Sequence, residues 1–102
     1  MLSKEINDLI TRVGPDDGAG RVLRHYWQPA ALTVELEGDR PVAAVRLMGE
    51  DLVLFRDNEG ELGLIGRQCP HRGADLCYGR REDNCIRCPF HGWHFDRTGQ
   101  CV

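Results

Sequence analysis

Two short cysteine–histidine motifs constrain this chain more than any other feature of its sequence. Cys69 and His71 form a C-x-H motif. Cys88 and His91 form a C-x-x-H motif, and sixteen residues separate the two motifs. A proline after each cysteine stiffens the loop by fixing φ, and a glycine close behind each histidine lets the backbone turn back. Each motif can therefore aim one thiol and one imidazole at a single point, which predicts a metal centre.

The ligand set alone suits two kinds of centre. One is a tetrahedral zinc site, and the other is a [2Fe–2S] cluster with two cysteines on one iron and two histidines on the other. Thiolates bind both metals, so they do not discriminate. Two ferric ions, two sulfides and two thiolates sum to zero charge, so such a cluster is easier to reduce than one held by four cysteines. The spacing by itself leaves both centres open.

The residues around the motifs resemble the signature of Rieske-type [2Fe–2S] domains. Cys69-Pro-His-Arg-Gly-Ala and Cys88-Pro-Phe-His-Gly-Trp-His-Phe-Asp are similar to the two ligand loops of one branch of that group. This branch is the N-terminal domain of the large subunit of Rieske non-haem iron oxygenases. The segments 24–30, 49–57 and 79–80 are similar to phthalate-dioxygenase-like and aryl O-demethylase enzymes, so the likeness covers nearly the whole chain. It favours the cluster over zinc.

The resemblance implies a role for each candidate ligand. Cys69 and Cys88 match the ligands of the inner iron, and His71 and His91 match those of the outer, more exposed iron. The implied function is electron transfer. A flavin/iron–sulfur reductase would reduce the [2Fe–2S] cluster, which would pass the electron to a mononuclear Fe(II) in a catalytic domain or neighbouring subunit. That second iron would hydroxylate or demethylate an aromatic compound, and the full-length protein would be a homo-oligomer.

The remaining cysteines are expected to be free thiols. In respiratory Rieske proteins a disulfide ties the two loops at positions matching Ala74 and Phe90, and neither is cysteine here. The loops must therefore be held by packing. Cys77, Cys85 and Cys101 are most simply reduced in a cytoplasmic protein.

The fold is expected to be mainly β, a Rieske-type antiparallel β-sandwich with two cluster-binding loops and a short helical N-terminal segment. We predict a helical and extended segment over residues 1–40 and the Rieske domain over residues 41–102. Strands are expected at 42–48, 52–55, 62–65 and 86–87, with a hairpin pairing 93–96 with 100–102. Residues 76–84 read as a surface connection. Further C-terminal strands of a Rieske domain are expected to be missing.

The N-terminal segment has apolar residues at helical spacing over residues 3–12, with Ser3 as the expected N-cap. A second helix is expected over 18–25, with Val22 and Leu23 facing inward. Trp27 is expected in core or interface packing. Outside the metal motifs, His25 and His94 read as surface imidazoles and do not predict a second iron site.

Composition supports a soluble globular domain. The 102 residues carry a net charge of −3, with no basic run that would indicate nucleic-acid binding. No apolar run approaches the eighteen residues of a membrane span, and no signal peptide is visible, so a cytoplasmic setting is expected. Two alternative functions stay open: a stand-alone Rieske ferredoxin, and a structural zinc-binding interaction module. The aromatic substrate is not identified by these residues.

Overall fold

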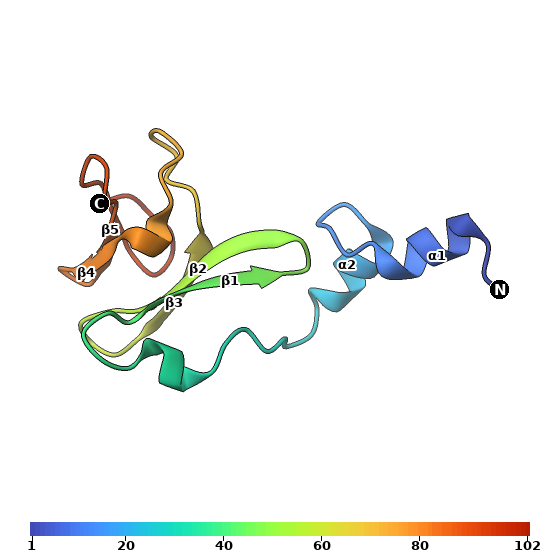
Figure 1. Ribbon diagram of the computed structural model, residues 1–102, viewed down its shortest axis with the longest axis horizontal. Helices are drawn as coiled ribbons and strands as arrows, with labels where there is room; N and C mark the ends of the chain where they lie inside the picture. The colour runs from blue at the N-terminus through green and yellow to red at the C-terminus, as the bar shows by residue number, and fades with distance from the viewer. The chain divides into compact units, whose positions relative to one another are not determined.

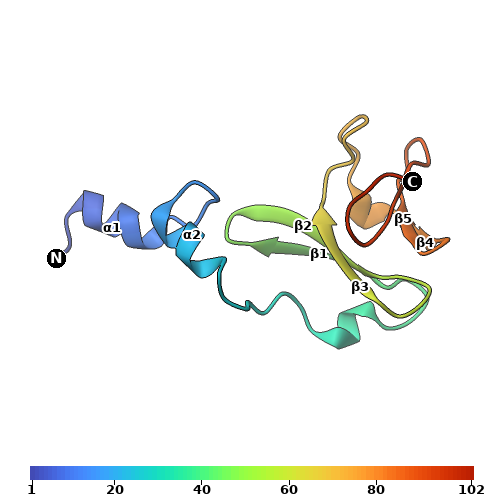
Figure 2. The same ribbon diagram turned by 180° about the vertical axis from the view of Figure 1, so that it is seen from behind.

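The computed structural model describes all 102 residues, and it contains short helices followed by two small antiparallel sheets (Figures 1 and 2). The helices are α1 (Lys4–Thr11) and α2 (Gly18–Leu23), with 3-10 turns η1 (Thr33–Leu36) and η2 (Leu76–Tyr78). The strands are β1 (Val42–Leu47), β2 (Glu50–Arg56), β3 (Leu62–Gly66), β4 (Arg80–Glu82), β5 (Cys85–Arg87) and β6 (His94–Phe95). The predicted mainly-β class with a short helical N-terminal segment is confirmed.

The chain divides into two compact units. One unit comprises Met1–Ala30 and Arg46–Glu50, and the other comprises Ala31–Val45 and Asp51–Val102. The predicted domain boundary at residue 40 stays a prediction. The longest helix, α1, has 8 residues, and no helix here is suited to crossing a membrane.

Both predicted N-terminal helices are present in the first unit. Ser3 caps α1 as predicted, since its hydroxyl accepts the N–H of Ile6 at 3.3 Å. The expected burial of α2 is wrong, because Val22 is 59% exposed and Leu23 is 37% exposed. The buried residue of α2 is Gly20, and a Cβ there would lie 2.5 Å from the carbonyl oxygen of Val13. The helix therefore packs through its glycine backbone, and its apolar side chains stay accessible.

Arg24 joins α2 to the rest of the first unit. Its Nη1 donates to the carbonyls of Val13 at 2.8 Å and Gly20 at 3.0 Å. Its Nη2 lies 2.6 Å from the carboxylate of Glu50, at the tip of the β1–β2 hairpin. One guanidinium thus satisfies backbone acceptors at the end of α2 and forms an ion pair with the hairpin.

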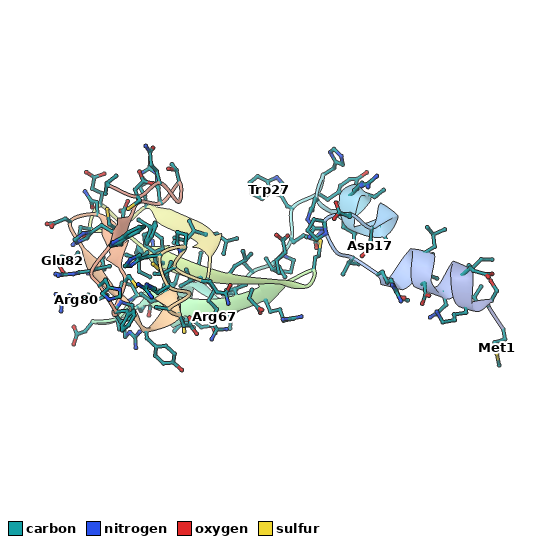
Figure 3. The ribbon with its side chains drawn as sticks, turned by 90° about the horizontal axis from the view of Figure 1, so that it is seen from above. Met1, Asp17, Trp27, Arg67, Arg80 and Glu82 are labelled. Atoms are coloured by element: carbon teal, nitrogen blue, oxygen red, sulfur yellow. The ribbon has the colours of Figure 1, made fainter.

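The side chain of Trp27 projects away from the ribbon and is fully exposed (Figure 3). The expectation of core packing for Trp27 is therefore wrong, and the alternative of an interface stays a prediction. His25 is exposed, as predicted. Large aromatic residues are buried on average. Whether a given one such as Trp27 is buried depends on whether other parts of the chain pack against it.

The first sheet has the predicted antiparallel meander, in the order β1-β2-β3. Val53 pairs with Ile65 and Leu54 pairs with Leu64 across β2 and β3. The turn between these strands contains Asp57, which is 3% exposed. Its carboxylate accepts the backbone N–H groups two and four residues further on, each at 2.9 Å. The connection between β2 and β3 is therefore an Asx-type turn with a buried carboxylate.

The second sheet has the order β4-β5-β6. The predicted surface connection over residues 76–84 is wrong in two respects: Leu76 is 1% exposed, and β4 pairs with β5. The charged residues of β4 are compatible with a strand because one face of a small sheet remains in water. The predicted C-terminal hairpin is confirmed, since Phe95 bridges Cys101 and the Asp96 N–H donates to the Gln100 carbonyl at 3.0 Å.

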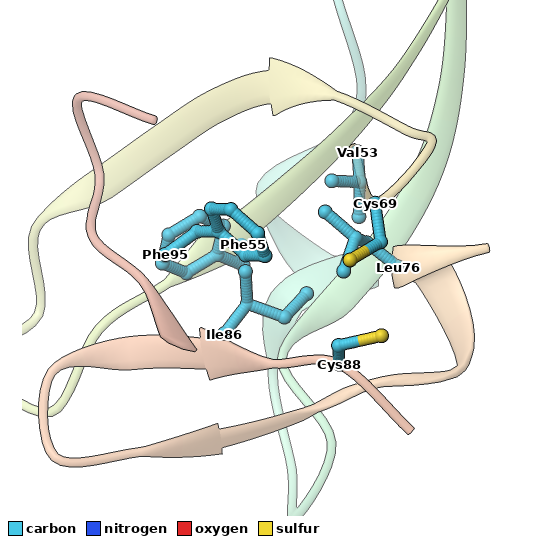
Figure 4. Packing of buried hydrophobic residues seen from close by; sticks show 7 residues of the cluster. All are labelled: Val53, Phe55, Cys69, Leu76, Ile86, Cys88 and Phe95. Carbon is cyan, nitrogen blue, oxygen red and sulfur yellow. The ribbon is translucent and has the colours of Figure 1, made fainter. Parts of the chain in front are cut away.

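One hydrophobic core joins the two sheets (Figure 4). It contains residues from β2, η2, β5 and β6 together with one cysteine from each metal motif: Val53, Phe55, Cys69, Leu76, Ile86, Cys88 and Phe95. Both candidate metal loops therefore begin inside the core, which fixes the position of their first residues.

Candidate metal centre

The two metal motifs form loops that are closed by the same pair of backbone hydrogen bonds. The Cys69 N–H donates to the carbonyl five residues on at 2.8 Å, and the Gly73 N–H donates to the Cys69 carbonyl at 2.7 Å. The Cys88 N–H likewise donates to the Trp93 carbonyl at 2.7 Å, and the Gly92 N–H donates to the Cys88 carbonyl at 3.1 Å. Both glycines have positive φ, +72° and +79°, which favours residues without a Cβ. The two metal loops therefore have the same backbone hydrogen-bonding pattern.

The two cysteines lie at the bases of these loops, where water is excluded. Cys69 is 2% exposed and Cys88 is 3% exposed. Burial raises the pKa of the Cys69 thiol; the backbone N–H of His71 acts in the opposite direction, and the neighbouring Cys88 thiol raises it further. An isolated thiolate is disfavoured here. A metal cation would supply the missing positive charge and displace the thiol protons.

The two histidines lie together further along the same loops. His71 is half-buried and His91 is exposed, and their ring centroids are 4.7 Å apart in a T-shaped arrangement. Trp93, from the second loop, stacks on His71 with a centroid separation of 4.4 Å and an interplanar angle of 9°. The chain thus presents two buried sulfurs and two adjacent imidazoles, one of each from either loop.

The arrangement of these four side chains, two thiols in the core and two adjacent imidazoles further along the loops, is compatible with a centre of two metals. Tetrahedral zinc with ligands at about 2.0–2.3 Å brings all four ligand atoms within about 4 Å of one another. The chain has one group of three or more potential ligands whose atoms all lie within 4.8 Å of one another, and it is elsewhere, at Glu82, Asp83 and His94. A cluster with one iron for the sulfurs and a second for the imidazoles fits a divided donor set.

The group at Glu82, Asp83 and His94 is poorly suited to a cation. Glu82 already forms ion pairs with Arg80 at 2.9 Å and Arg87 at 3.2 Å. Glu82 and Arg80 are labelled close together in Figure 3. A metal there would compete with two guanidinium groups. His94 itself is half-buried and its Nε2 is buried without a partner, so the expectation of a surface imidazole is wrong for this residue. Its place on β6, within the second sheet, accounts for the burial.

The three remaining cysteines form no disulfide in the structure, and their expected free-thiol state stays a prediction. Cys77 is half-buried, Cys85 is buried and Cys101 is exposed. The sequence interpretation overlooked Arg67 and Asp75, whose side chains pair across the base of the first loop at 2.7 Å. It also assigned no contact to Trp93. Neither a salt bridge over eight residues nor a stack between two loops produces a periodic sequence pattern.

The small β-fold and the paired loops define an iron–sulfur type of metal domain. Residues 26–102 match the model of the Rieske [2Fe-2S] domain, and the chain belongs to this family. A domain of this family implies a Rieske [2Fe–2S] cluster, and the zinc-module alternative receives no support.

The relatives confirm the resemblance to oxygenase subunits. The chain is 50% identical, over its whole length, to the 5,5'-dehydrodivanillate O-demethylase oxygenase subunit of Sphingobium sp. (strain NBRC 103272 / SYK-6), and covers 24% of that protein. It is 44% identical to the phthalate 4,5-dioxygenase oxygenase subunit of Pseudomonas putida, again covering 100% of the chain and 24% of the relative. Among solved structures, NdmA of Pseudomonas putida CBB5 matches with a TM-score of 0.73 and 36% identity, over 80% of this chain and 26% of that one. The chain therefore spans about a quarter of these relatives' length.

Proposed function

We propose that Cys69, Cys88, His71 and His91 hold a Rieske-type [2Fe–2S] cluster, with the cysteines on the inner iron and the histidines on the outer iron. The observation that carries this proposal is the repeated loop closure, which places two buried thiols and two neighbouring imidazoles at equivalent places in two loops. The divided donor set described above suits two irons.

The bound cluster would supply one-electron transfer. The buried cysteines would shield the inner iron from water, and their place in the hydrophobic core would limit movement of the loops. The imidazoles, of which His91 is the more exposed, would form the edge through which electrons enter and leave. This division between a fixed, dry base and an accessible tip is what an electron carrier between two partners requires.

In the larger enzyme, this domain would accept one electron from a flavin/iron–sulfur reductase and pass it to a mononuclear iron. That iron would lie in a catalytic domain or a neighbouring subunit of a cytoplasmic homo-oligomer and would act on an aromatic compound. Support comes from the relatives, which are oxygenase subunits that match the chain from end to end. The likeness over the N-terminal helices favours this setting over a stand-alone ferredoxin.

Metal analysis of single variants tests the proposed ligands. The full chain, purified without oxygen, should contain two irons and two acid-labile sulfides. Replacing any one ligand, for example Cys88→Ala or His91→Ala, should abolish the cluster. Cys101→Ala is a matched control because this cysteine is exposed, and Cys77→Ala is a second. A ligand variant that keeps the native spectrum, or a control variant that folds and loses the cluster, would refute the assignment.

A further inference from the structure

The stack between Trp93 and His71 is a contact between the two loops. The rings are nearly parallel at 9°, with centroids 4.4 Å apart. The backbone of Trp93 is held in place, since its carbonyl accepts the Cys88 N–H at 2.7 Å. On the core side, its ring lies 6.5 Å from that of the buried Phe95. The second loop therefore places an aromatic ring against the imidazole of the first.

Few other interactions tie the loops together. Apart from the two cysteine thiols, no hydrogen bond or ion pair joins residues 68–74 to residues 88–93. No disulfide is present, and the positions of Ala74 and Phe90 exclude the one used by respiratory Rieske proteins. Phe90 contacts His91 at a centroid distance of 3.9 Å, but both residues belong to the second loop. Two aromatic contacts therefore cross between the loops: the T-shaped contact between His71 and His91, and the stack of Trp93 on His71. Of the two, the stack brings in a residue outside the four proposed ligands.

The stack has the geometry needed to orient a metal-binding imidazole. The nitrogen lone pairs of histidine lie in the plane of its ring, so a partner on the ring face restricts rotation without occupying either nitrogen. Histidine ligands are usually oriented by a hydrogen bond from the outer N–H to a carboxylate or carbonyl. Stacking of the indole on the His71 ring would restrict the same rotation from the ring face.

We propose that Trp93 is a positioning residue for the first loop, which holds the His71 ring in the orientation for binding the outer iron and links the two loops in place of a disulfide. The inference rests on the proposed function, since it presumes that His71 binds iron. In this proposal Trp93 does not bind the metal but orients a residue that does. Removing the indole should alter the coordination of the outer iron while leaving all four ligands present.

Three single variants of the full chain test this role. Trp93→Leu removes the aromatic face and keeps an apolar side chain, whereas Trp93→Phe keeps a smaller aromatic face. Tyr78→Leu is the matched control, because it removes an aromatic side chain that is 70% exposed and contacts neither proposed histidine ligand. Each cluster-loaded protein is examined by electron paramagnetic resonance in its reduced state. The rate of iron release to a chelator is then measured under the same conditions.

Trp93→Leu should shift the g-values of the reduced cluster and release iron about ten-fold faster, the scale of losses seen for outer partners of metal ligands. Trp93→Phe should restore most of both properties, and Tyr78→Leu should match the wild type. If Trp93→Leu has the same g-values and the same rate of iron release as the wild type, the inference is overturned. If Trp93→Leu takes up no cluster, Trp93→Phe decides: impairment as severe as that of Trp93→Leu would exclude an aromatic orienting role. A wild-type chain without iron would instead refute the proposed function itself.

Discussion

Arg67 and Asp75 form a clasp across the base of the first metal loop. The Arg67 Nε lies 2.9 Å from both carboxylate oxygens of Asp75, and Nη2 lies 2.7 Å from Oδ2. A backbone hydrogen bond joins the same two ends of the loop, since the Leu76 N–H donates to the Arg67 carbonyl at 2.8 Å. Asp75 also accepts the Cys77 N–H at 2.9 Å and so starts η2. The loop that contains Cys69 is therefore closed by an ion pair outside its own backbone bonds.

We expect Asp75→Asn to destabilise the domain in a pH-dependent way. The hydrogen bond from Arg67 holds the pKa of the Asp75 carboxyl well below its usual range. A depressed pKa in the folded state stabilises the fold above the unfolded-state pKa, about 3.9, and this stabilisation is lost as the pH falls below that value. At pH 7, Tm should be several degrees lower in the variant than in the wild type. Below about pH 4 the difference should shrink.

Thermal unfolding of both proteins at pH 7 and at about pH 3 measures this difference. Asp39→Asn serves as the control, because Asp39 is exposed and forms no ion pair. It should leave Tm unchanged at both values. An Asp75→Asn protein with wild-type stability at neutral pH would show that the clasp contributes nothing.

The loops and strands could be predicted because their signals are local. A cysteine and a histidine two or three residues apart, with proline and glycine nearby, leave few loop conformations. The strands of the first sheet are bounded by turn residues such as Asp57 and Gly60. The clasp between Arg67 and Asp75 has no comparable signal, since its partners are brought together only when the loop closes.

Burial was the less predictable property. The helix expected over residues 18–25 is present as α2, but Val22 and Leu23 are exposed because the helix packs through Gly20. For Leu76 the error is the opposite: it was expected in the surface connection over residues 76–84 and yet lies in the core. Periodicity identifies which side chains share a face. Whether another part of the chain covers that face depends on tertiary contacts that no short window contains.

Leu76→Ala should be strongly destabilising. The side chain is 1% exposed and packs among the residues that position both cysteines, and truncating a buried leucine typically costs about 2–5 kcal/mol. Leu64→Ala is the matched control: this leucine is 42% exposed, so its truncation should cost less than about 1 kcal/mol. Urea unfolding of the cluster-loaded chain gives both values. Equal losses from the two substitutions would contradict the assigned core.

Gly20→Ala should weaken the first unit, although alanine normally stabilises a helix relative to glycine by about 1 kcal/mol. A Cβ on residue 20 would clash with the Gly14 carbonyl oxygen and lie 2.5 Å from that of Val13. Gly18→Ala is the comparison within the same helix, because the nearest atom to its Cβ would be a Leu9 methyl at 3.7 Å. Hydrogen exchange of the α1 and α2 amides should accelerate in Gly20→Ala and not in Gly18→Ala. Unchanged protection in both would contradict the backbone packing described for α2.

The last prediction is that this chain accepts electrons but does not oxygenate a substrate. In the proposed cluster each iron has two bridging sulfides and two protein ligands, which leaves no position for oxygen. A separate oxygen-activating iron is typically held by two histidines and a carboxylate. After His71 and His91, only His25 and His94 remain, and the single close ligand group contains one histidine, His94. That group also includes Glu82, which is already paired with two arginines.

Mixed with a flavin-dependent reductase and reduced nicotinamide, the chain should therefore take up one electron per cluster. It should give no hydroxylated or demethylated product from phthalate-like or methoxybenzoate-like acids, with or without added ferrous iron. His94→Ala provides the internal control, since it removes the imidazole of the one close ligand group and leaves the proposed cluster ligands intact. Product that requires added iron and disappears in His94→Ala would place a second iron site at β4 and β6. The separation of electron entry from oxygen chemistry would then be wrong, because both would occur within these 102 residues.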